Sequence, residues 1–240
     1  MKGEGIRRAP RKRTSQLNMD AATFGTKWAR GAAFSIPLLG IWVILDLTVV
    51  PKSSLREFDP QSVARLETGM WRSYYAKERV SLFTEMAELL RTQYHFSRLR
   101  SYLGAYYAAR AAVIFQRGHE RPEYEQALLP LRRFYRMIGT SSDSPFDEGE
   151  AARLELEWWI VHRDRANHGP GDLADALAGL QAAIYKIPPD KLKGHASARA
   201  AAMILRDEDA AKAHAPAQAD WGQIQVLLSA SWTSLWQALH

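Results

Sequence analysis

From residue 60 onward, apolar side chains recur every three or four positions, and runs of alternating β-branched residues are missing. This spacing is typical of amphipathic helices rather than strands. Glycine and proline separate the helical stretches, and the pair Asp59-Pro60 opens the first as a cap and a first-turn residue. The sequence therefore predicts an all-α domain of about seven helices, over residues 60–94, 97–117, 121–138, 147–168, 172–187, 189–207 and 219–238.

The segment Ala32–Val50 differs from the rest of the chain, because its nineteen residues carry one charge, Asp46. As a helix it would reach about 28 Å, close to the ~30 Å hydrocarbon core of a bilayer. We predict one transmembrane anchor over residues 31–51, a linker over 52–59 and the all-α domain over 60–240. A cleaved signal peptide and a buried core helix are the alternatives. However, no small-x-small cleavage site follows the segment, and its flanks are polar.

Positive charge is concentrated at the N-terminus. Residues 1–30 carry eight Lys and Arg and two acids, which accounts for the net charge of +6 of the whole chain. Cationic residues before an apolar span favour a cytoplasmic N-terminus. We therefore place the all-α domain outside the cytoplasm. If the source is bacterial, the anchor lies in the inner membrane and the domain on its periplasmic side. We expect residues 1–30 to be disordered and to contact anionic lipid. The expected partners are membrane lipid, through residues 31–51 and the basic arm, and other membrane or periplasmic proteins, not nucleic acid.

Two helical segments are similar to each other. Residues 124–138 and 173–187 both contain Ala-Leu, a further Leu three positions on, and aromatic residues near the end. The offset between them is 49 residues, from Ala127 to Ala176. The pattern resembles a degenerate tetratricopeptide-type array over about residues 97–238, although that family has a period of 34 residues and a Trp-Leu-Gly-Tyr signature that this chain lacks. The resemblance implies stacked helical hairpins with a concave interaction surface. An ordinary helical bundle is the alternative.

Polar and aromatic residues share one face of the first predicted helix. Their spacings of four, three, four and seven place them in one stripe, and an apolar stripe on the second helix contains Tyr106 and Arg110. We expect Arg110 to point inward and to pair with the glutamates of the first helix. This candidate pocket is a closed salt-bridge network, a ligand pocket or a carboxylate-bridged metal site, and it consists of Glu67, Trp71, Tyr74, Glu78, Glu85, Tyr106 and Arg110.

A metal site has weak support in the sequence. Helical di-metal sites typically use Glu-x-x-His, which this chain lacks, and it has no cysteine. The weak candidates for ligands lie on the fourth predicted helix: Glu155, His162, Asp164 and His168. On the same helix, Trp158 and Trp159 fall on two faces, which predicts core packing or an exposed aromatic patch. We expect no metal and no cofactor.

Signatures of common enzymes are missing. The chain has no Gly-x-Ser-x-Gly and no phosphate-binding glycine loop, and the Gly-x-Gly at Gly169-Pro170-Gly171 marks a helix end. We therefore assign no catalytic residue, and whether the protein is an enzyme stays open. The sequence favours a membrane-anchored helical scaffold or assembly protein with its main domain outside the cytoplasm. The alternative is a ligand- or metal-binding enzyme that uses the Glu, Tyr and Arg cluster of the first two helices.

Overall fold

The computed structural model describes residues 40–46, 48–214 and 219–240. Contacts divide the chain into two units, Met1–Thr48 and Val49–His240. In the first unit, residues 40–46 are helical. The predicted basic arm, residues 1–30, and residues 31–39 and 47 of the predicted anchor lie outside the described residues. None of the helices that the structure describes is long and apolar enough to cross a membrane. The anchor over residues 31–51 therefore stays a prediction.

The second unit is helical, as predicted, and no strand occurs among its described residues. Its α-helices are α2 (Pro60–Tyr75), α3 (Arg79–Tyr94), α4 (Arg98–Arg117), α5 (Arg121–Tyr124), α6 (Leu128–Ser141), α7 (Glu148–Arg163), α8 (Asp172–Tyr185), α9 (Lys193–Ala213) and α10 (Trp221–Leu239). Three 3-10 turns connect them: η1 (Glu125–Ala127), η2 (Arg165–Asn167) and η3 (Pro189–Leu192).

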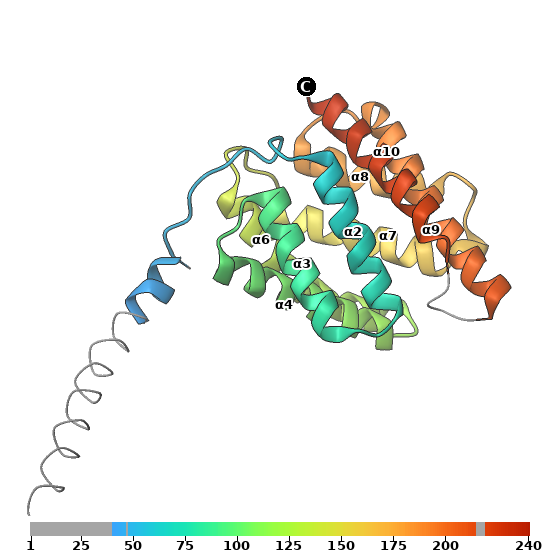
Figure 1. Ribbon diagram of the computed structural model, residues 1–240, viewed down its shortest axis with the longest axis horizontal. Helices are drawn as coiled ribbons and strands as arrows, with labels where there is room; N and C mark the ends of the chain where they lie inside the picture. Colours follow the sequence, from blue (N-terminus) through green and yellow to red (C-terminus); the bar gives the residue numbers. More distant parts are fainter. Residues whose placement is uncertain (1–39, 47, 215–218) are drawn as a thin grey trace, which may run out of the picture. The chain divides into compact units, whose positions relative to one another are not determined.

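The long helices of this unit form a closed ring. In the described chain, α2, α3, α4, α6, α7, α8, α9 and α10 each pack on the next, and α10 packs back on α2. Figure 1 shows α2 between α3 and α10. Neighbouring helices run in opposite directions, as short connections require. For example, Arg100 at the start of α4 donates to the Met137 carbonyl near the end of α6 (3.1 Å). The helical pairs thus enclose a centre instead of forming an open array.

The apolar core lies where these helices meet. Several of its large side chains are completely buried, and together they come from six elements of the ring and its connections: Val63, Leu131, Ile138, Leu156, Leu177, Leu192, Ile224, Leu228 and Leu235. The predicted linker also contributes, since Leu55 and Phe58 are buried and the Ser53 amide donates to the Ser141 carbonyl (2.8 Å). Residues 53–58 are therefore packed onto the helical domain.

The predicted single helix over residues 60–94 is wrong, because the structure has two helices there. Lys77 adopts a left-handed conformation with φ 61°, and the Glu78 amide donates back to the Ser73 carbonyl (2.9 Å). This geometry closes a helix C-terminus and normally uses glycine. Lysine at the left-handed position is why no stop was visible in the sequence. The break turns α2 and α3 into a hairpin.

Other predicted helices differ at their ends. The helix predicted over residues 121–138 is α5, η1 and α6, and it continues to Ser141. The helix predicted over residues 147–168 stops at Arg163 and is followed by η2. The helix predicted over residues 189–207 begins as η3 and continues as α9 to Ala213.

Helix α4 packs through the face opposite to the one predicted. Its buried positions include Gly104, Ala105 and Ala111, whereas Tyr106 and Arg110 are exposed. A Cβ on Gly104 would lie 2.9 Å from Leu90 Cδ1, so glycine lets α3 and α4 approach closely. Small residues decided the packing face here, and Tyr106, Arg110 and Val113 of the larger stripe face solvent.

Candidate functional site

The helical ring encloses a cavity of about 540 Å³, which we call the lumen. This volume lies within the range of small-molecule sites. Every helix of the ring lines it, among them through Trp71 of α2, Met86 of α3, Ala112 of α4, Phe134 of α6, Trp159 of α7, Gln181 of α8, Arg199 of α9 and Trp232 of α10. The lumen follows from ring closure, since each helix supplies one inward stripe.

The lumen opens to solvent at one end of the ring. Three of its lining residues, Tyr74, Gln116 and Arg163, are exposed, and each lies at the last turn of its helix. Their helices α2, α4 and α7 run in the same direction, because neighbours in the ring alternate. We call this end the mouth.

Glu67 lies halfway along α2 in a closed ion pair. Its side chain is 1% exposed, and its Oε1 atom lies 2.5 Å from Arg199 Nη2 on α9. Trp232 Nε1 on α10 donates to Glu67 Oε2 (2.6 Å). The ion pair and the indole donor thus offset the cost of burying this carboxylate. The contact joins three helices of the ring.

Glu155 lies halfway along α7 and is held by neutral donors. Tyr135 Oη (2.8 Å) and Trp158 Nε1 (2.9 Å) both donate to Oε2, and Trp159 Nε1 donates to Oε1 (3.0 Å). Within the described residues, no Lys, Arg or His nitrogen forms an ion pair with this carboxylate. Its side chain is deep in the domain yet half-buried, because it borders the lumen.

The surroundings of Glu155 alter two pKa values. Burial raises the pKa of Glu155, while the indole and phenol donors and the positive charge of Arg199 oppose that rise. Burial also raises the pKa of Tyr135 well above its usual range, and the nearby Glu155 charge raises it further. Tyr135 therefore stays a phenol and a donor at neutral pH.

A third polar group lies near the mouth, around Asp207 of α9. Its carboxylate contacts His162 Nε2 (3.1 Å), Arg165 Nη1 (2.9 Å) and Arg206 Nη1 (2.8 Å). Burial alone would raise the pKa of Asp207, but the hydrogen bonds from His162 and Arg206 lower it to about 2. The Arg206 guanidinium also lies 3.1 Å from the centre of the Tyr75 ring.

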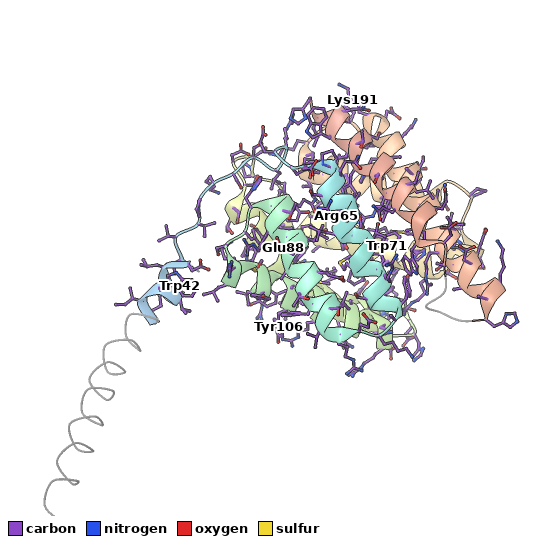
Figure 2. The ribbon with its side chains drawn as sticks, in the orientation of Figure 1. Trp42, Arg65, Trp71, Glu88, Tyr106 and Lys191 are labelled. Atoms are coloured by element: carbon purple, nitrogen blue, oxygen red, sulfur yellow. The ribbon has the colours of Figure 1, made fainter. Side chains whose placement is uncertain are left out.

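The seven residues of the predicted pocket do not form one site. Glu67, Trp71 and Tyr74 line the lumen. Glu85 lies against α2, with Oε1 3.1 Å from where a Cβ of Gly69 would be. The remaining three are exposed: Glu78, Tyr106 and Arg110. Figure 2 labels Trp71 on α2 and Tyr106 on α4.

The predicted pairing of Arg110 with the glutamates is wrong, because Arg110 lies on the outward face of α4. Arg199 of α9 forms the ion pair with Glu67 that we had predicted for Arg110.

The four weak metal candidates are also separate. Glu155 and His162 line the lumen, but His162 bonds Asp207. Asp164 accepts from Asn167 Nδ2 (2.6 Å), and His168 contacts Asp172 (3.3 Å). In the part of the chain that the structure describes, no three His, Cys, Asp or Glu side chains are placed to hold a metal ion.

Sequence reasoning missed most of the groups around Glu155. The useful signal was local: Trp158 and Trp159 follow Glu155 by three and four residues, so both indoles can reach back one turn to its carboxylate. We had assigned these tryptophans to core packing or to a surface patch, and not to a polar contact. Tyr135 and Arg199 come from other helices and had no such local signal.

Comparison of the chain with protein families, with curated proteins and with solved structures gave no match.

Proposed function

We propose that the helical domain is a binding protein that holds a small organic molecule, largely aromatic or apolar, inside its lumen. The observation that carries the proposal is the cavity of about 540 Å³ lined by all eight helices of the ring in the described chain. Ligand sites are typically apolar and aromatic, with a few polar groups that fix orientation. Here Trp71, Phe134 and Trp159 supply aromatic surface, and Glu155 and Arg199 are fixed polar groups.

The proposal is a version of the ligand-binding alternative from the sequence, moved from the α2–α4 face to the lumen. It keeps Glu67, Trp71 and Tyr74 as lining residues. The polar groups are held by protein donors, as orienting groups in a preformed site are. Pre-ordered side chains lower the entropy cost of binding.

A dye-binding experiment on the full chain tests this function. The probe is N-phenyl-1-naphthylamine, which is uncharged and becomes fluorescent in apolar surroundings. Ala112 lines the lumen from α4, and its neighbour Val113 is 45% exposed on the outer face. We expect Ala112→Phe to fill part of the lumen and to weaken dye binding at least tenfold, while Val113→Phe leaves it unchanged.

The two variants add the same ring at adjacent positions of one helix. Dye taken up by any other part of the chain is common to both variants and cancels in the comparison. Equal dye binding by Ala112→Phe, Val113→Phe and the unmodified protein would refute binding in the lumen.

A second candidate function is the membrane-anchored scaffold with its domain outside the cytoplasm. It is favoured by an aromatic and apolar stripe on the outer face of α4, where Tyr102, Tyr106 and Val113 are 45%, 48% and 45% exposed. Exposed apolar patches commonly mark interaction surfaces. A photocrosslinking amino acid at Tyr106 should then give a discrete adduct in cells. The same amino acid at Arg65, exposed on α2, is the control, and equal labelling at both positions argues against a docking face.

A further inference from the structure

The charged groups halfway along the lumen do not balance. Two carboxylates lie there, Glu67 and Glu155, with one guanidinium, Arg199. Arg199 is in direct contact with Glu67, and its charge acts on Glu155 only from a distance. Burial raises the pKa of Tyr94 well above its usual range, the charges of Glu155 and Glu67 raise it further, and the charge of Arg199 opposes them. With both acids ionised, this centre carries one negative charge that the protein does not pair directly.

The donors around Glu155 favour its ionised form. A carboxylate that accepts from a phenol and two indoles receives three hydrogen bonds, and hydrogen bonds to the charged form stabilise it. Two of these donors bind Oε2, and one binds Oε1, so Oε1 keeps room for a further donor. Within the described residues, the groups around Glu155 supply hydrogen bonds but no direct counter-ion.

The same region is rich in aromatic rings. Trp158 and Trp159 meet edge to face at 88°, with their centroids 6.1 Å apart, and Phe115 lies 5.2 Å from Trp159. All three line the lumen, but the Arg163 guanidinium already lies over the Phe115 ring, 4.0 Å from its centroid, which leaves the two tryptophans for a ligand. Faces of aromatic rings attract organic cations, and a carboxylate beside them adds a full charge.

From this geometry we infer that the lumen selects organic cations, protonated amines with an aromatic or apolar body, and that Glu155 is their counter-ion. The inference rests on the proposed binding function and names the class of ligand. The ammonium group donates to the open position at Glu155 Oε1, and the apolar body of the ligand lies against the rings of Trp158 and Trp159. Glu67 contributes little to selection, because Arg199 already neutralises it.

Three ligands of matched shape test this inference by calorimetry on the full chain at neutral pH. They are 1-naphthylmethylamine, 1-naphthylmethanol and 1-naphthylacetate, which are a cation, a neutral compound and an anion. We expect the amine to bind at least tenfold more tightly than the alcohol, and the acetate to bind most weakly. An amine no tighter than the alcohol overturns the inference, and tighter binding of the acetate overturns it in favour of an anion.

Variants then assign the selection to Glu155. In Glu155→Gln we expect the amine and the alcohol to bind within about threefold of each other, with alcohol binding retained as evidence of folding. Glu157→Gln is the matched control, since Glu157 lies on the same helix and pairs with Arg121 at the surface. An unchanged preference for the amine in Glu155→Gln refutes the role of Glu155. If Glu155→Gln does not fold, the order of the three ligands on the unmodified protein still decides.

Failure of the inference and failure of the proposed function give different results. If Ala112→Phe weakens binding of the alcohol, but the unmodified protein shows no preference for the amine, the binding function stands and the selection of cations is refuted. If none of the three ligands binds, and Ala112→Phe leaves dye binding unchanged, both the proposed function and the selection of cations are refuted.

Discussion

Two carboxylates face the same lumen, and the protein treats them differently. Glu67 on α2 is 1% exposed, forms an ion pair with Arg199 and accepts from Trp232 Nε1, so its charge is neutralised within the chain. Glu155 on α7 accepts from Tyr135, Trp158 and Trp159, and it has neutral partners only. The difference indicates two roles. Glu67 joins helices of the ring, and Glu155 keeps a charge available to a molecule in the lumen.

The largest effect should come from removing the cation that satisfies Glu67. Arg199→Met leaves a buried carboxylate without its partner, which typically costs about 3–5 kcal/mol. We expect the free energy of unfolding, measured in urea, to fall by about that amount. Lys212→Met on the same helix is the control, because Lys212 is 72% exposed, and it should change stability little. Equal effects of the two substitutions would show that the Glu67–Arg199 pair does not support the ring.

A smaller effect is expected at Glu155, where one donor among three is lost. Tyr135→Phe removes the hydrogen bond from Oη to Oε2 and should cost about 1.5 kcal/mol, the low end for a bond to a charged group, because water in the lumen can replace it. Unfolding in urea measures this cost. Tyr102→Phe, at an exposed tyrosine of α4, serves as control. A loss as large as that of Arg199→Met would mean that Glu155 is as closed as Glu67.

A third carboxylate, Glu157, lies at the surface, and its ion pair should contribute least to the free energy of unfolding. Glu157 receives both guanidinium nitrogens of Arg121, at 2.8 and 2.9 Å, but the Arg121 side chain is 53% exposed. Exposed ion pairs contribute little, so Arg121→Ala should lower the free energy of unfolding by less than about 1 kcal/mol. A loss of several kcal/mol in the same urea measurement would contradict this ranking by burial.

The dependence of stability on pH should separate Glu155 from Asp207. The folded pKa of Glu155 is raised above 4.5 by burial, so its contribution is complete below pH 4.5 and is lost as pH rises through the folded value. The stability of the unmodified protein relative to Glu155→Gln should therefore fall as pH rises above 4.5. Asp207 has the opposite sign, because its pKa is lowered from 3.8 to about 2. Its contribution is complete above pH 3.8 and is lost as pH falls toward 2.

Urea unfolding at several pH values measures both slopes, with Asp207→Asn as the second variant. Slopes of the same sign for Glu155→Gln and Asp207→Asn would contradict the assignment of neutral donors to one carboxylate and cationic partners to the other.

The sequence predicted the helical class and most helices, because their apolar period is strong and Gly or Pro ends several of them. It failed where the decisive contact is not local. Lys77 ends α2 in a conformation for which glycine is the usual signal, so the α2–α3 hairpin was hidden. On α4 the larger apolar stripe suggested the inner face, but Gly104 and its small neighbours determine how closely α3 approaches.

The candidate site was predicted only in part, because some of its decisive contacts also join residues that are distant in the sequence. Glu67 could be assigned to the interior from the stripe on its own helix, and it is buried. Its cation could not be identified, because Arg199 comes from α9, which is linked to α2 through α10, the helix that packs on both. Glu155 with Trp158 and Trp159 had a local spacing of three and four residues, which is visible in the sequence once one asks which groups two adjacent indoles can reach.

The most direct test of the account is the affinity of 1-naphthylmethylamine for the full chain and for two variants, Ala112→Phe in the lumen and Val113→Phe on the outer face. If the amine binds inside the lumen, Ala112→Phe weakens its binding at least tenfold and Val113→Phe leaves it unchanged. An affinity that is the same in all three proteins, or that Val113→Phe reduces as much as Ala112→Phe does, would contradict a ligand site inside the ring.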